Sequence, residues 1–321
     1  MRIMKTINLR PGIPERDFRQ LSAWFSSLED DPTTEDGLKE YYEKQKERII
    51  QVVAEDQRGE LLGFYWSTRS NLEAGQVYFD LFVKPDQRQQ GAGRQLYDDW
   101  VRAAIEAQVK TLRVNIRDTC PECLAFAERR GFSELWRSFS MTLNLDDFDG
   151  QPYDEIINRL KREGFKFTSM EELGNTEDAQ RKLYILNETT GMEALGTNGA
   201  PTWASFEDFQ KNVCQTDWYK PGGQMVVIES ATGIWSAMSA VTRMKEKDYA
   251  NTLYTGVDKR YRGRKLAQAA KVMALRYARD VLKVSSVHTN CNSKNLPIIA
   301  INRKFGYIQM PGFILMKKDL E

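Results

Sequence analysis

The chain has 321 residues, of which 41% are hydrophobic and 28% charged, and such a length and composition are typical of two globular domains. Its 46 basic and 45 acidic residues give a net charge of +1, which removes the electrostatic argument for nucleic acid or an anionic membrane as a partner. Four cysteines and one histidine exclude a disulfide scaffold and a zinc site built from several histidines. No apolar run is long enough for a signal peptide or a transmembrane helix, which predicts a cytoplasmic protein.

Hydrophobic spacing in the first half predicts a strand, two helices, three strands, a helix, a strand, a helix and a strand. The expected strands are 5–11, 49–56, 60–69, 76–85, 112–118 and 138–145, and the expected helices are 17–28, 35–47, one from the RQQGAG turn to about 108, and one ending at Gly131. This order predicts an α/β domain with a mixed, mostly antiparallel β-sheet and helices on both faces.

The acidic segment Asp146–Pro152 has no apolar period, and we place a domain boundary there, which gives domains 1–150 and 151–321. The second half repeats the order of the first. The expected elements are helices at 153–163 and 177–188, a helical segment at 205–213, strands at 164–170, 224–230, 233–243, 251–259 and 285–290, a helix after the YRGRK turn, and a helix ending at Gly306. Gly263 follows Gly91 at nearly the same spacing along the chain as Gly306 follows Gly131, which predicts a duplicated domain.

Each half contains a strand that runs into a glycine-containing turn at the start of a helix, within Leu81–Trp100 and Thr255–Lys271. Free N–H groups at a helix start bind anions, and nearby arginines add positive charge. Neither the GxxxxGK[ST] loop nor the dinucleotide GxGxxG motif is present. The alternative is a pair of ordinary helix-capping turns, but the recurrence after equivalent strands favours two diphosphate sites.

The first turn, Arg88–Gly93, satisfies the motif [RQ]-x-x-G-x-[GA], and in this it resembles the GNAT acetyltransferase superfamily. Arg260–Lys265 satisfies the first four positions and departs from the motif at Lys265. Asn290–Tyr307 is similar to the family's distal asparagine-rich segment, and Arg117–Phe132 is a weaker counterpart. The whole chain resembles bacterial tandem-GNAT proteins, which implies two tandem GNAT-like domains that use acetyl-CoA and no metal.

The resemblance also implies which residues bind acetyl-CoA. The main chain of one strand in each half would lie along the pantetheine arm, the turn amides would bind the diphosphate, and two asparagines would line the second cleft. These residues are Phe82, Val83, Lys84, Arg88, Gln89, Gln90, Gly91, Ala92, Gly93 and Arg94 in the first half, and Thr255, Gly256, Val257, Tyr261, Arg262, Gly263, Arg264, Lys265, Leu266, Asn290 and Asn295 in the second.

The implied reaction is direct attack of a primary amine, on a small molecule or a peptide, on the acetyl thioester. It requires a donor to the developing oxyanion and an acid for the leaving thiolate. The family often places a carboxylate on the strand and a tyrosine on a later helix, where this sequence has Ala127 and Asn302. Asp80 is the acid of the first strand, and Tyr78 or Tyr254 could replace the tyrosine. We take Asp80 and Tyr254 as the candidate catalytic residues.

Several alternatives stay open. The missing tyrosine and Lys265 are compatible with a non-catalytic acyl-CoA sensor or scaffold, in which one or both sites are degenerate. Cys120 and Cys123 form a CxxC, which indicates either redox or metal chemistry or a plain helix start with a capping box from Thr119 to Glu122; the sequence favours the plain helix start. His288 is either a general base or a packed strand residue, and the second is favoured. We expect a monomer or a homodimer that binds no nucleic acid and no membrane.

Overall fold

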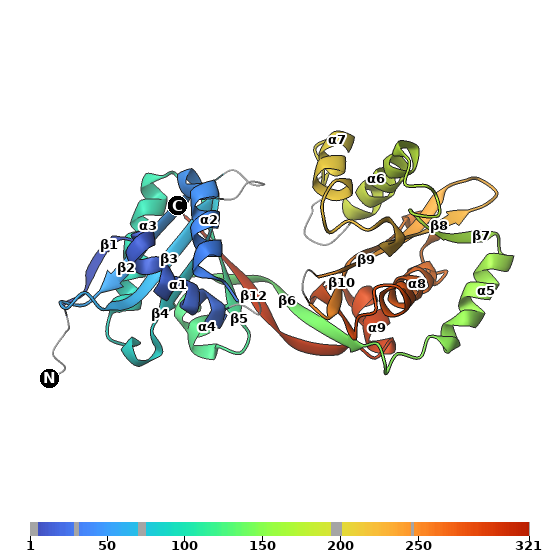
Figure 1. The fold of residues 1–321 in the computed structure, drawn as a ribbon. Helices are drawn as coiled ribbons and strands as arrows, with labels where there is room; N and C mark the ends of the chain where they lie inside the picture. Colours follow the sequence, from blue (N-terminus) through green and yellow to red (C-terminus); the bar gives the residue numbers. More distant parts are fainter. Residues whose placement is uncertain (1–5, 29–31, 70–74, 194–200, 245–246, 321) are drawn as a thin grey trace. The chain divides into compact units, whose positions relative to one another are not determined.

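The structure is a computed structural model that describes residues 6–28, 32–69, 75–193, 201–244 and 247–320. It divides into two compact units (Figure 1). The first unit comprises residues 1–137 together with 312–321, and the second comprises residues 138–311.

Within the described residues, the first unit contributes six strands in the order β1-β2-β3-β4-β5-β12, and the β4–β5 pair is the parallel one among them. Its strands are β1 (Asn8–Pro11), β2 (Ile49–Glu55), β3 (Leu61–Arg69), β4 (Gln76–Val83), β5 (Thr111–Arg117) and the C-terminal part of β12 (Ile308–Asp319). Its helices are α1 (Pro14–Leu28), α2 (Glu35–Gln45), α3 (Ala92–Glu106) and α4 (Pro121–Glu128). Nine of these ten strands and helices follow the predicted order, and β12 is the exception.

Helices cover both faces of this sheet because neighbouring strand residues point to opposite sides. On one face, α1 and α2 bury an aromatic cluster that includes Phe18 and Trp66. On the other face, α3 and α4 pack over a second cluster, in which the rings of Phe79 and Trp100 stack with centroids 3.7 Å apart.

The second unit has the sheet order β6-β11-β10-β9-β8-β7, and among its described strands the β10–β11 pair is the parallel one. Its strands are the C-terminal part of β6 (Ser133–Asn144), β7 (Phe165–Ser169), β8 (Gln224–Glu229), β9 (Trp235–Arg243), β10 (Tyr249–Val257) and β11 (Ser286–Asn292). Its helices are α5 (Asp154–Arg162), α6 (Glu177–Gly191), α7 (Phe206–Phe209), α8 (Leu266–Asp280) and α9 (Leu296–Lys304). One face carries α5, α8 and α9, and the other carries α6 and α7.

The predicted mixed, mostly antiparallel sheets are confirmed, but one strand belongs to the other sheet. Residues 138–145 are predicted as the last strand of the first half, whereas Ser138–Asn144 of β6 pairs with β11 in the second unit. The partner of β5 is instead β12, a strand that the sequence analysis did not predict. Periodicity specifies a strand and its buried face but not its neighbour. The predicted domain boundary at residue 150 stays a prediction. The compact units are divided differently, at residues 137/138 and 311/312, because β6 and β12 each begin in one unit and end in the other.

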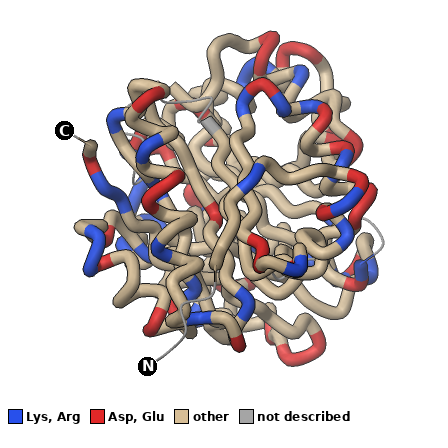
Figure 2. Tube along the Cα trace, turned by 90° about the vertical axis from the view of Figure 1, so that its left-hand side faces the viewer, with Lys and Arg blue, Asp and Glu red and all other residues tan. Residues whose placement is uncertain are grey.

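Basic and acidic residues are interleaved along the trace in the view of Figure 2. Among the described helices, none combines the length and the apolar character that crossing a membrane requires.

Candidate functional site

Both units contain a parallel strand pair that separates part of the way along. In the first unit, β4 pairs with β5 only from Gln76 to Tyr78, and beyond that point β4 pairs with β3 alone. In the second unit, β10 pairs with β11 only from Tyr249 to Asn251 and then with β9 alone. The strands therefore splay, and in the part of the chain that the structure describes no strand pairs with one edge at the end of β4 and at the end of β10.

The strand β4 leads into the first predicted diphosphate turn. Gln89 and Gly91 have positive φ values of 60° and 103°, and Gly91 is the N-cap of α3. The Arg88 Nε donates a hydrogen bond of 3.2 Å to the Val83 carbonyl, which fastens the turn to the end of the strand. Left-handed residues turn successive N–H groups toward one side, and the first-turn amides of α3 have no partner within the helix. This geometry suits an anion.

The other predicted residues of the first turn lie around this anchor. The Lys84 N–H donates to the Leu62 carbonyl, and the Gln90 side chain donates to the Asp86 carbonyl. Phe82 and Ala92 are buried, Arg94 is exposed, and Gly93 faces Val83, whose Cγ2 would lie 3.4 Å from an added Cβ.

The structure corrects the register of the second turn. The Arg262 Nε donates 3.2 Å to the Val257 carbonyl, which is the same contact that Arg88 makes. Arg262, rather than Arg260, is thus the counterpart of Arg88, and the expected alignment of Gly263 with Gly91 is wrong. Arg260 folds back onto Asp258, with Nη2 and Oδ2 2.6 Å apart. In this register Ala267 satisfies the last motif position.

Lys265 consequently stands where the first half has Gly91. It is the N-cap of α8 and has a φ of 71°, in the left-handed region that favours glycine. Gly263, with a φ of 80°, corresponds to Gln89. The side chain of Lys265 is exposed at the helix start, where it adds a positive charge beside the free amides.

Two arginines of the second turn, Arg262 and Arg264, form ion pairs with glutamates. Arg262 forms an ion pair with Glu193, and Arg264 Nη2 lies 2.9 Å from a Glu163 oxygen. The hydroxyl of Tyr261 donates to Glu229 over 2.9 Å. Leu266 is buried.

The two halves differ where the strands separate. The register of β10 with β9 shifts between Thr252 and Tyr254, so Leu253 is an extra, bulged residue, whereas β4 pairs with β3 without a shift. Bulges leave one residue unpaired and are frequent beside active sites. The predicted catalytic residues Asp80 and Tyr254 occupy the same position, three residues before the end of β4 and of β10. Only Tyr254 directly follows a bulge.

Tyr254 is held by α6. Its hydroxyl donates a hydrogen bond of 3.0 Å to Thr190 Oγ1, and burial raises the pKa of this tyrosine. Gly256 permits this approach, because an added Cβ would lie 2.6 Å from Thr190 Oγ1. The Thr255 hydroxyl contacts Ser239 at 3.1 Å. Asp80 lies opposite Trp66 in the register and is exposed.

The remaining candidates are placed as follows. Asn290 accepts a hydrogen bond of 2.7 Å from Ser140 on β6, and Asn295 is the N-cap of α9. Arg113 donates to the Tyr78 hydroxyl over 3.0 Å. The ring of His288 stacks on Tyr249 with centroids 4.2 Å apart.

A buried polar cluster, which is not predicted from the sequence, lies next to the point where β10 and β11 separate. Lys271 and Asn302 are fully buried, the Lys271 Nζ lies 5.0 Å from the Tyr307 ring, and the Asn302 Nδ2 lies 3.3 Å from the Cys291 Sγ. The cluster consists of Thr252, Lys271, Cys291, Asn302 and Tyr307. The residues at the matching element positions of the first unit are Phe79, Tyr97, Ile116, Ala127 and Phe132.

Burial lowers the pKa of Lys271 to about 8 and raises that of the neighbouring Cys291. Among the described residues, Lys271 Nζ and Asn302 Oδ1 have no hydrogen-bond partner. Aligning the two halves on Gly131 and Gly306 would have revealed much of this cluster, because polar residues replace a largely apolar layer there.

The helix start at Cys120 also differs from the expectation. The helix α4 begins at Pro121 with Cys120 as its N-cap and without a side-chain capping bond, so the predicted capping box from Thr119 to Glu122 is wrong. Cys120 and Cys123 are joined by a disulfide. Glu122 instead accepts a hydrogen bond of 3.0 Å from Arg88 Nη1.

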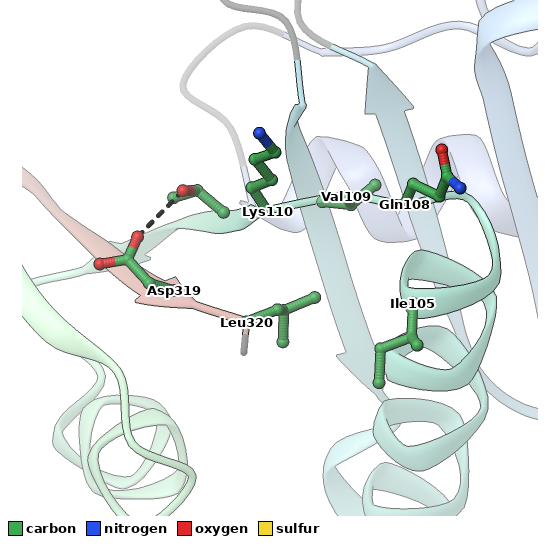
Figure 3. Close-up of a pocket in the computed structure, with 7 residues that line it drawn as sticks. Ile105, Gln108, Val109, Lys110, Asp319 and Leu320 are labelled. Carbon is green, nitrogen blue, oxygen red and sulfur yellow. Dashed lines mark hydrogen bonds between the residues drawn. The ribbon is translucent and has the colours of Figure 1, made fainter.

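A pocket of about 500 Å³ lies in the first unit, at the C-terminal end of α3 (Figure 3). Its lining includes Ile105, Lys110 and Leu320, and Thr111 donates a hydrogen bond of 2.9 Å to Asp319 at its edge. The predicted diphosphate turn is at the opposite, N-terminal end of α3, a 15-residue helix that is about 22 Å long. None of the predicted cofactor residues lines this pocket.

Comparisons with known proteins identify a family domain in the first unit and similar folds for the whole chain. Residues 47–134 match the model of the GNAT acetyltransferase domain. A GCN5-related N-acetyltransferase from Sphaerobacter thermophilus is 17% identical with a TM-score of 0.68, over 98% of this chain and 95% of that one. A tandem GNAT protein of clavulanic acid biosynthesis is 17% identical with a TM-score of 0.64, over 98% of both chains. No curated protein matches the sequence.

A third structure contains a glucosamine N-acetyltransferase region of a fungal multidomain β-N-acetylglucosaminidase. It is 15% identical with a TM-score of 0.72, over 98% of this chain and 38% of that one. At these identities the similarity establishes the fold, which is that of two tandem GNAT-like domains. The predicted resemblance is thereby confirmed.

Proposed function

We propose that this chain, which carries a GNAT domain at residues 47–134 and has the tandem GNAT fold throughout, is an acetyl-CoA-dependent N-acetyltransferase. It transfers the acetyl group to a primary amine of a small molecule or a peptide. The observation that carries the proposal is the repeated arrangement in which a splayed strand edge leads into an arginine-anchored turn at a helix start.

The residues present fit acetyl-CoA. The unpaired edges of β4 and β10 offer main-chain groups to the pantetheine arm near Phe82–Lys84 and Thr255–Val257. The amides of Gln89–Arg94 and of Gly263–Leu266 lie at turns with left-handed residues and at helix starts, which is backbone geometry that suits a diphosphate. When bound, acetyl-CoA supplies an activated acetyl thioester at the splayed strands.

We assign the transfer step to the second half. Its β10 strand has the bulge, which frees a main-chain N–H that can donate to a developing oxyanion. Tyr254 directly follows the bulge, and its hydroxyl, whose pKa burial raises, is protonated at neutral pH and carries the proton that the leaving thiolate needs. The first half has the better motif but a regular β4, and it fits the alternative of a site that binds acyl-CoA without catalysis.

Two matched variants test the proposal, because Arg88 and Arg262 make the same contact in the two halves. Calorimetry with CoA should give two equivalents bound to the wild type and one equivalent to either Arg88→Ala or Arg262→Ala. Release of free CoA across a panel of amines, followed by chromatography, should be lost in Arg262→Ala and largely retained in Arg88→Ala.

The outcomes separate the alternatives. Binding of CoA without amine-dependent release over a broad panel would replace the enzyme with the sensor. Loss of turnover in Arg88→Ala alone would move the transfer step to the first half. No CoA bound at either site would contradict the cofactor assignment itself. A cytoplasmic location, and a monomer or homodimer with no nucleic-acid or membrane partner, stay predictions.

A further inference from the structure

The cysteine pair of the first unit is placed as a reactive couple. Cys120 is the N-cap of α4 and Cys123 lies in its first turn, and both are partly exposed. The amides and the dipole of a helix start stabilise a thiolate at these positions. The disulfide between them can therefore be reached by a dissolved thiol, and the thiolate that its opening releases is stabilised.

The same pair is connected to the diphosphate turn. A carboxylate oxygen of Glu122 lies within 4.8 Å of both sulfur atoms. Glu122 also accepts a hydrogen bond of 3.0 Å from Arg88, the residue that fastens the turn to Val83. A charge that appears on a cysteine is therefore felt at the arginine and at the neighbouring helix-start amides.

We propose that Cys120 and Cys123 are a reversible thiol–disulfide couple, which exchanges with small-molecule thiols and sets how tightly the first-half turn binds the diphosphate of CoA. The second clause rests on the proposed function, whereas the exchange itself does not.

The exchange balances in two steps. A thiolate attacks one sulfur, the Cys120–Cys123 bond breaks, and the other cysteine leaves as a thiolate, which the helix-start amides stabilise. A second thiolate then attacks the small-molecule sulfur of the mixed disulfide. This releases the oxidised small-molecule dimer and the second cysteine, which takes up a proton from water. Two electrons pass from two small thiols to the protein disulfide.

The oxidised pair is neutral, whereas a thiolate adds negative charge beside Glu122 and offsets the positive charge of Arg88. A bound diphosphate is also negative, so the reduced form should bind CoA more weakly at this site. The second unit supplies the internal control for redox-dependent CoA binding, because its matching helix start has no cysteine pair. Its α9 has Asn295 as its N-cap, at the place of Cys120, and Ile298 at the place of Cys123.

The first experiment needs no CoA. The full chain is equilibrated with graded mixtures of reduced and oxidised glutathione, quenched in acid and alkylated, and the peptide containing Cys120 and Cys123 is analysed by mass. We expect a reversible two-electron titration and a trapped glutathione adduct in Cys123→Ser. A peptide that stays disulfide-bonded at every ratio would overturn the proposal, and so would a reduced protein that binds one equivalent of Zn²⁺ tightly.

The second experiment measures CoA binding by calorimetry with and without reduction. One of the two equivalents should bind several-fold more weakly after reduction, and the double variant Cys120→Ser/Cys123→Ser should bind equally with and without reductant. Equal binding of both equivalents in the two redox states would overturn the link to the turn. Because the glutathione titration is independent of CoA, failure of the proposed function would leave its result intact.

Discussion

Arg88 and Arg262 make one and the same contact in the two halves of the chain. Each Nε donates to the carbonyl of the last residue of the preceding strand, Val83 or Val257, over 3.2 Å. This pair of bonds aligns the two turns residue by residue and identifies Gly91 and Lys265 as counterparts at the two helix starts.

Replacing Lys265 by glycine should raise the free energy of unfolding by about 1 kcal/mol, because Lys265 holds a left-handed φ of 71° that glycine adopts without a steric penalty. Gly91→Ala, at a φ of 103°, should lower it by a similar amount. Denaturant unfolding measures both. A Lys265→Gly protein less stable than the wild type would contradict the strain argument.

The same Lys265→Gly change should weaken CoA binding at the second turn only, because it removes a positive charge beside the helix-start amides that we propose bind the diphosphate. Calorimetry measures the two equivalents separately. The gain in stability and the loss in affinity should thus occur together in one variant.

Tyr254→Phe should reduce the rate of acetyl transfer by about 100-fold or more, because a positioned acid contributes on the order of 10² or more to such a rate. CoA stoichiometry should stay at two. Asp80→Asn is the matched control, since Asp80 has the same position on β4, which has no bulge, and it should change turnover little. Near wild-type turnover in Tyr254→Phe would remove this tyrosine from the mechanism.

Lys271→Met should stabilise the protein at neutral pH. Burial lowers the pKa of Lys271 from 10.5 to about 8, so between these values the unfolded chain binds the proton more tightly than the folded chain. Stability of the wild type should therefore rise with pH through this window, by about 3 kcal/mol from this residue, and the full penalty should be present below it. The methionine variant should lack the rise.

Unfolding of both proteins from pH 7 to pH 9.5 covers the lower part of this window, in which the rise should be about 2 kcal/mol. The difference between them isolates Lys271 from tyrosines that titrate at higher pH. A difference that stays constant across the range would show that the ammonium is compensated in the folded state.

Removing residues 312–321 should destabilise the first unit selectively. This segment of β12 pairs with β5 from Phe313 to Asp319 and buries Ile314, Leu315 and Met316. Full burial of such side chains contributes about 1.5–3 kcal/mol each, so the loss should be about 5 kcal/mol. Hydrogen exchange should accelerate in β5 and stay slow in β9. A fragment of residues 1–150 should share this defect, and unchanged protection of β5 would contradict it.

Much of the candidate site could be predicted from the sequence, because its main features are local. The turn at Arg88–Gly93 needs a residue with a positive φ at Gly91, and the sequence motif specifies a glycine at that position. The register of the second turn was misjudged because Arg260 and Arg262 fit the same letters, and only the contact with Val257 distinguishes them. Glu122 was assigned to a local capping box, although its partner Arg88 is distant in the sequence.

The sequence by itself determined the order of the strands and helices apart from β12, the duplication and the two turns at the starts of α3 and α8. These depend on hydrophobic period and on φ preferences, which act over a few residues. The tertiary structure decided that β6 and β12 complete each other's sheets, that β10 is bulged where β4 is regular, and that Lys271 is buried beside Tyr307. Pairing, register and burial depend on residues distant in the chain, and no local pattern carries that information.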